Sequence, residues 1–211
     1  LPISQDGLTS SPAAAAFLAR ASQAGRLRID VASYLRWSVA DAIIAENSLK
    51  VGGPYVGHLK FAGVKITADG SPQGKTAYLS QPYLHPPHDA PSDYRGYPTV
   101  PEDELVGWYD RFMGRGWQVQ THCNGDACID MVLAAVSKAY EIHSEARRTR
   151  PVVIHSQVTR RDQLEAYQRL GIFPSFFAEH TFYWGDWHRD ETLGPDRGAF
   201  ISPTAAAEHL K

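Results

Sequence analysis

Segments typical of β-strands alternate with segments typical of α-helices along most of this 211-residue chain. Short runs rich in Val, Ile and Phe are followed by longer runs with helical spacing of apolar residues. Such alternation is typical of parallel strands that are joined by crossover helices. We predict strands at residues 27–34, 61–67, 117–121, 151–155 and 172–177, and helices at residues 11–25, 38–49, 101–114, 126–143 and 161–170.

Two architectures fit this alternation, an open doubly wound sheet and a (β/α) barrel. The open sheet usually carries a Gly-rich phosphate loop after its first strand, and no strand here is followed by G-x-G-x-x-G. The stretch GSPQGKT at residues 70–76 has the wrong spacing and does not begin a helix, which disfavours a phosphate-binding barrel. Because a complete barrel takes ~250 residues, we predict an α/β fold that is a partial (β/α)8 TIM barrel with about five of eight strands.

Composition excludes several classes of protein. There are 21 Lys and Arg residues against 23 Asp and Glu, and this net charge of −2 disfavours binding to nucleic acid or an anionic membrane. No apolar run reaches the ~18 residues of a membrane span. Cys123 and Cys128 do not form a C-x-x-C pair, and we expect both to be reduced and partly buried, which favours a cytoplasmic location.

The segment at residues 69–99 contains six prolines and four tyrosines and shows neither helical nor strand periodicity. A structureless segment of this length is uncommon inside a compact domain and usually has a function. We predict an insertion loop that lies over a site. A flexible linker is the alternative, although the tyrosines favour packing.

Polar side chains stand where the predicted strands end. His122 and His155 follow two such strands, and parallel strands bring their carboxyl ends to one edge. Imidazole is the commonest metal ligand in proteins, so the pair predicts a metal site. Lys65 lies inside an otherwise apolar strand, where a lysine is costly unless it is paired, deprotonated or modified. A salt bridge between Lys65 and Asp69 is the alternative interpretation.

Four stretches resemble the amidohydrolase superfamily, in a branch similar to N-substituted formamide deformylase. They are KITADGSPQGKTA at 65–77, HCNGDACIDMVLAA at 122–135, RPVVIHSQ at 150–157 and HTFYWGDWHRDETLGP at 180–195. The similarity runs from about Gly7 to Thr204, and family members combine a (β/α)8 barrel with a small β-sandwich. The resemblance implies that Lys65 is the often carboxylated lysine of the fourth strand. It also implies that His122 and His155 are metal ligands of the fifth and sixth strands, with Zn²⁺ as the expected metal.

Two parts of the family's metal site do not occur in this sequence. The chain contains no His-x-His pair, which the family places on its first strand. The general-base aspartate of the eighth strand is expected beyond Lys211. We therefore expect residues 1–211 to form the central part of a single TIM-barrel catalytic domain.

The resemblance implies a hydrolase that cleaves amide or N-substituted formamide C–N bonds with metal-activated water. A small-molecule amide would be its substrate. Candidate residues for contacting the substrate or supporting the ligands are Asp69, Ser71, Asn124, Asp126, Gln157, His180 and Trp184. A non-catalytic binding or scaffold protein descended from the barrel is the alternative. We expect this chain to be nearly inactive alone and to associate with a second copy or with a segment that supplies the remaining strands.

Overall fold

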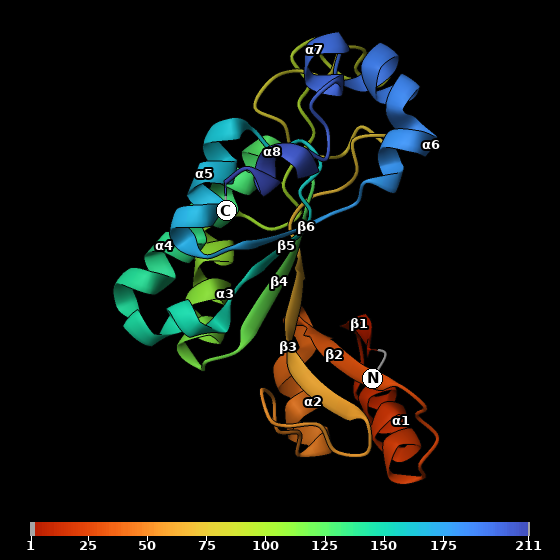
Figure 1. Cartoon of the computed structure of the whole chain (residues 1–211), viewed down its shortest axis with the longest axis vertical. Helices are drawn as coiled ribbons and strands as arrows, with labels where there is room; N and C mark the ends of the chain where they lie inside the picture. The colour runs from red at the N-terminus through yellow and green to blue at the C-terminus, as the bar shows by residue number, and fades with distance from the viewer. Residues whose placement is uncertain (1–2, 211) are drawn as a thin grey trace.

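The computed structural model describes residues 3–210, which form one curled sheet of six parallel strands in the order β1-β2-β3-β4-β5-β6 (Figure 1). Strands that neighbour each other in the sheet also follow each other in sequence, as in a barrel wall and unlike a doubly wound sheet. The fold is therefore a partial TIM barrel, as predicted. The strands are β1 (Ile3–Thr9), β2 (Asp30–Arg36), β3 (Leu59–Thr67), β4 (Gln118–Cys123), β5 (Val152–His155) and β6 (Phe173–Phe176).

Helices cover the outer face of this half-barrel, and a second group lies beyond the carboxyl ends of the strands (Figure 1). The covering helices are α1 (Pro12–Gln23), α2 (Ala40–Asn47), α3 (Glu102–Gly114), α4 (Asp126–Ile142) and α5 (Arg161–Leu170), with short turns η1 (Trp37–Val39) and η2 (Ser144–Thr149). The second group is α6 (Glu179–Trp187), the π-helical turn η3 (His188–Thr192) and α7 (Pro195–Gly198). The last helix, α8 (Thr204–Glu208), lies beside α5. None of the helices within residues 3–210 is long and apolar enough to cross a bilayer.

The predicted helices and strands are confirmed with small shifts of their ends, but the estimate of about five strands is wrong. The structure contains a sixth, β1, whose sequence ISQDGLT lacks a clear apolar alternation. Its backbone pairs in parallel with β2, and the Thr9 hydroxyl lies 2.6 Å from that of Ser33 in the buried interior. Pairing with a distant partner, which local sequence does not show, therefore defines this strand.

The outer face of the sheet carries the hydrophobic core. Val64 of β3 pairs with Val119 of β4, and Thr121, two residues further along β4, accepts or donates a 2.7 Å hydrogen bond with the buried Tyr109 hydroxyl of α3. Cys123 and Cys128 also lie in this core. Both are free thiols, as expected, but they are fully buried rather than partly buried.

The inner face of the sheet is polar. Lys65 pairs in register with Gln120, and His122 stands two residues further along β4, so all three side chains start from the same face. Hydrogen bonds cross this face between strands, because Tyr34 donates to Gln118 and Gln5 donates to Gln120. In a complete barrel this inner face lines the interior. Here hydrogen bonds between side chains of different strands join its polar groups.

The segment between β3 and α3 contains no helix or strand, but it is packed against α6 and η3. The backbone N–H of Leu84 donates to the Thr192 carbonyl at 2.8 Å, and that of His85 donates to the Glu191 carbonyl at 3.2 Å. The Tyr83 and Tyr94 rings stack with centroids 5.8 Å apart. Tyr83 and Tyr94 thus pack, as predicted, whereas Tyr97 is 49% exposed. The role of residues 69–99 as a cover for a site stays a prediction.

A close contact between two segments makes Gly125 structurally important. A Cβ atom at Gly125 would lie 1.9 Å from the Tyr78 carbonyl oxygen, although the Gly125 φ of −82° suits any residue.

We expect Gly125→Ala to lower the free energy of unfolding by ~1–3 kcal/mol through steric strain. Urea unfolding measures this change. The control Gly107→Ala, at an exposed helical position with open space around it, is expected to raise stability by ~0.5–1 kcal/mol. An unchanged Gly125→Ala protein would contradict the close contact.

Two strand edges are open in the described residues, because no pairing joins β1 to β6. Phe173 at the β6 edge is 61% exposed. Unpaired edges with apolar side chains tend to pair with other chains.

We expect the 211-residue chain to self-associate in size-exclusion chromatography with light scattering, and Phe173→Lys to reduce this association. A compact monomer at all concentrations would contradict the expectation.

Candidate metal centre

His122 ends the polar inner face at the carboxyl end of β4. Its Nε2 atom lies 3.3 Å from the Gly70 carbonyl oxygen and 3.0 Å from Asn124 Nδ2. Asn124 Nδ2 also donates to the Gly70 carbonyl at 2.8 Å. Nδ1 of His122 has no hydrogen-bond partner within residues 3–210, so this nitrogen is the one left for a ligand.

His155 ends β5 in a strained turn. His155 and the next residue, Ser156, have φ angles of 75° and 46°, which non-glycine residues rarely adopt. The Ser156 N–H donates to the Cys123 carbonyl at 3.1 Å, and the Ser156 hydroxyl lies 3.1 Å from that of Tyr167. The turn brings the His155 ring to 4.6 Å from the His122 ring, edge to face. The structure thus brings together the two histidines that the sequence singled out.

Lys65 approaches the same place from β3. Among the described residues it forms no ion pair, so its interpretation as a salt-bridge partner of Asp69 is wrong. The Asp69 carboxylate accepts hydrogen bonds from backbone N–H groups instead, and it is almost fully buried. Burial raises the pKa of Asp69, and the backbone donors lower it by favouring the carboxylate. Burial has the larger effect, and the resulting pKa is about 7.

The electrostatics keep both imidazoles neutral at neutral pH. Burial, together with smaller contributions from the neighbouring His122, Lys65 and His180, lowers the pKa of His155 to about 3. Burial also lowers the pKa of His122, with a smaller contribution from Lys65 and an opposing one from the Gly70 carbonyl. Burial lowers the pKa of Lys65 as well. A neutral imidazole is the form that binds a metal ion.

Gln157 and His180 stand behind His155. Gln157 Oε1 lies 2.9 Å from His180 Nδ1, and the His180 ring is parallel to the His155 ring at 6.2 Å between centroids. Phe177 packs against His180 at 4.1 Å and against His155 at 5.7 Å. This group supplies a fixed imidazole and an apolar wall beside the two candidate ligands.

Several buried polar atoms near the histidines have no hydrogen-bond partner among the described residues. They include Asn124 Oδ1 and Gln157 Nε2, and both ring nitrogens of His188. Buried polar atoms are normally paired, so these atoms are candidates for contact with a polar group of a ligand. No sequence motif indicated His188 as a candidate site residue. It lies in a π-helical turn, and no local pattern predicts such turns.

Three of the predicted site residues are not joined to the histidines by any described contact. Ser71 shapes a tight turn in which its N–H donates to Thr76 Oγ1 at 3.0 Å. The Asp126 carboxylate accepts from the Ser80 N–H at 2.8 Å and pairs with Arg160. Trp184 lies on α6 with 42% of its surface exposed.

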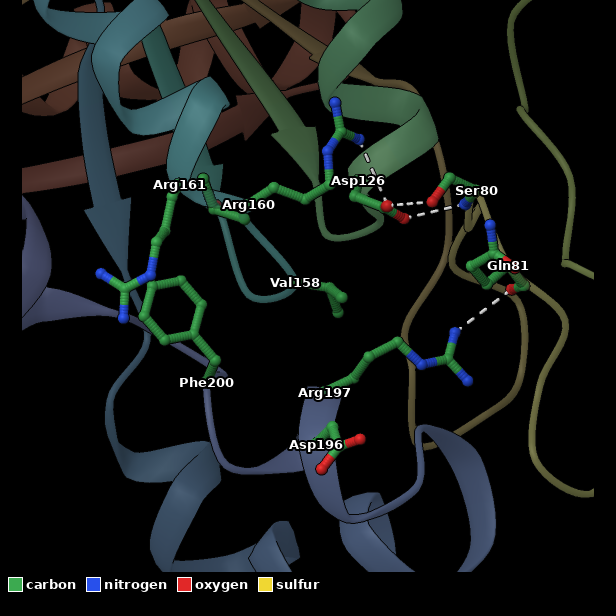
Figure 2. A pocket seen from close by; sticks show the side chains of 10 residues that line it. Ser80, Gln81, Asp126, Val158, Arg160, Arg161, Asp196, Arg197 and Phe200 are labelled. Carbon is green, nitrogen blue, oxygen red and sulfur yellow. Dashed lines mark hydrogen bonds and ion pairs between the residues drawn. The ribbon is translucent and has the colours of Figure 1, made fainter.

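Asp126 lines a separate pocket of about 450 Å³ between the amino ends of α4 and α5, residues 80–81 and α7 (Figure 2). Its centre is apolar, because Val158 and Phe200 face it and the Arg161 guanidinium stacks over the Phe200 ring at 4.5 Å. Arg197 points away from this centre and donates to the carbonyls of residues 81, 82 and 193. None of the residues His122, His155 and Lys65 lines this pocket.

Residues 3–209 match the model of the Amidohydrolase family, which covers nearly the whole chain. The chain belongs to the amidohydrolase family. It is 34% identical over 152 residues to the Bacillus subtilis (strain 168) protein named "Putative amidohydrolase YtcJ", with 70% of this chain and 26% of that protein aligned. This amidohydrolase chain therefore spans about a quarter of that relative.

Two solved structures share the fold of this family member. They are uncharacterized metal-dependent hydrolases from Pyrococcus furiosus and from Pyrococcus horikoshii OT3, both 24% identical, with TM-scores of 0.79 and 0.77. Each covers 99% of this chain, and the aligned part is 40% and 39% of the respective structure. The half-barrel therefore corresponds to a continuous part of larger hydrolase folds.

Proposed function

We propose that this chain forms the metal-binding wall of a hydrolase that cleaves amide or N-substituted formamide C–N bonds. One observation carries the proposal. The neutral rings of His122 and His155, at the carboxyl ends of adjacent parallel strands, lie 4.6 Å apart on the polar inner face that also bears Lys65. Membership of the amidohydrolase family supports the reaction class.

The donor set fits a divalent metal such as Zn²⁺, which favours imidazole nitrogens. His122, through its unpartnered Nδ1, and His155 would hold the ion. Lys65 would contribute an oxygen if its amine adds to CO₂ with release of a proton, giving a carbamate. When bound, the metal supplies a water of lowered pKa and polarises the carbonyl of the substrate.

The residues around the histidines match the polar groups of an amide. Within residues 3–210, Gln157 Nε2 is a donor and Asn124 Oδ1 an acceptor without a partner, and they would suit the carbonyl oxygen and the N–H of an amide. Phe177 offers an apolar wall for the substituent on nitrogen. Trp184 and the exposed aromatic residues beside it on α6 would extend this wall, which favours an N-substituted substrate. The family resemblance implies an aspartate of the eighth strand as the general base.

A non-catalytic binding or scaffold protein is the second candidate function. The sequence favours it in one respect, because these 211 residues contain no His-x-His pair to complete the family's ligand set. The two candidates differ in whether the half-barrel holds a metal ion, which is directly measurable.

We expect the purified chain to bind one Co²⁺ or Zn²⁺ ion, and His155→Ala to weaken binding at least about 10-fold by removing a ligand. Isothermal titration with elemental analysis measures this, and intact mass shows whether Lys65 carries one added CO₂. The control is His143→Ala, because His143 pairs with Asp110 at 2.7 Å at the far end of α4. Equal affinity in both variants would place the metal elsewhere, and absence of binding in the wild type would favour the scaffold.

We expect the 211-residue chain alone to show little or no hydrolysis of N-substituted formamides or aryl amides, even with metal added. The physical reason is that the site would lack the general base and the His-x-His ligands. Product amine formation with and without Zn²⁺ measures this. Metal-dependent turnover that His155→Ala abolishes would overturn the expectation and show a sufficient site.

A further inference from the structure

Asp69 is a buried carboxylate at the end of β3 that is held by three backbone donors. The N–H groups of Asn124, Gly125 and Tyr78 donate to it at 2.9, 2.8 and 3.1 Å. Only 1% of Asp69 is exposed. These bonds join the start of the segment 69–99 to the turn between β4 and α4, where Gly125 lies so close to Tyr78 that a Cβ atom would overlap the Tyr78 carbonyl.

The same turn holds His122. The carbonyl of Gly70, the residue after Asp69, faces His122 Nε2 at 3.3 Å, and Asn124 Nδ2 lies 3.0 Å from the same nitrogen. Asp69 Oδ1 itself is 3.8 Å from Nε2, which is too far for a hydrogen bond. When Nε2 is protonated, it and the Asn124 NH₂ group are both donors, so they do not bond each other and both point to the Gly70 carbonyl, which Asn124 Nδ2 holds at 2.8 Å. Asp69 therefore acts on His122 through the Gly70 carbonyl and through the Asn124 amide that holds this carbonyl.

We propose that Asp69 is a positioning residue that fixes the His122 ring with Nε2 protonated toward the Gly70 carbonyl and Nδ1 free for the metal. The inference deepens the proposed function, because it concerns the affinity of that metal centre. Groups that orient a ligating histidine typically change metal affinity by about 10- to 100-fold when they are removed.

A direct metal-binding role for Asp69 is less consistent with the structure. Oxygen of Asp69 and the sulfurs of Cys123 and Cys128 lie within 4.8 Å of one another, which resembles a ligand group. However, the carboxylate already accepts three backbone hydrogen bonds, and both thiols are fully buried in the core. The Cys128 thiol instead favours the ionised carboxylate and lowers the pKa of Asp69.

The test variant is Asp69→Asn, which keeps the side-chain shape but places an NH₂ group against backbone N–H donors. It cannot accept all three bonds, so the turn that carries Asn124 is released. The matched control is Asp126→Asn, at a buried carboxylate that holds the same 69–99 segment through Ser80 but has no described contact with His122. Thermal unfolding of each variant measures its loss of stability.

Two measurements decide the inference. In the metal-free protein, ¹⁵N NMR of the imidazoles is expected to show His122 in a single Nε2–H tautomer in the wild type and in Asp126→Asn, and a tautomer mixture in Asp69→Asn. In Co²⁺ titration, Asp69→Asn is expected to bind about 10- to 100-fold more weakly than Asp126→Asn.

The outcomes separate this inference from the proposed function. An unchanged His122 tautomer in Asp69→Asn, or equal Co²⁺ affinity in the two variants, would overturn the positioning role. If the wild type binds no Co²⁺, the proposed function fails, while the NMR comparison still decides whether Asp69 orients His122.

Discussion

The parallel register between β3 and β4 determines which side chains can meet at the carboxyl end of the half-barrel. Because Lys65 pairs with Gln120, the face that carries Lys65 also carries His122, and the opposite face carries Val64 and Val119 in the core. A shift of β4 by one residue relative to β3 would turn His122 toward the core and Val119 toward the polar inner face. The apolar packing of α3 and α4 on the outer face therefore holds the candidate metal centre in place.

The site contains features that cost stability. His155 and Ser156 both have positive φ angles, which typically cost ~1–3 kcal/mol each. Asn124 and Gln157 each keep a buried polar atom without a partner in the described residues. Strain and unpaired polar groups concentrate where a protein binds ligands, because a ligand compensates for them. Their position around His122 and His155 supports a ligand-binding role for this edge of the sheet.

The partial barrel also explains how a chain of this length belongs to a family of larger proteins. The sheet order, with each strand beside its sequence neighbour, allows a continuous part of a barrel to keep its register and its helix cover. The polar inner face and the edges at β1 and β6 are the surfaces that further strands would enclose. The fold thus accounts for the matching of 99% of this chain to 40% of a solved hydrolase.

The sequence by itself determined the local elements and the chemistry of the candidate ligands. Helical spacing and strand-like runs predicted α3, α4 and α5 closely, polar residues at strand ends indicated His122 and His155, and a charge inside an apolar strand indicated Lys65. Only the tertiary structure decided that β1 is a strand, that Asp69 holds backbone amides rather than Lys65, and that the Gly70 carbonyl faces His122 across 52 residues of chain. The physical reason is that these interactions join residues far apart in sequence, so no local propensity contains them.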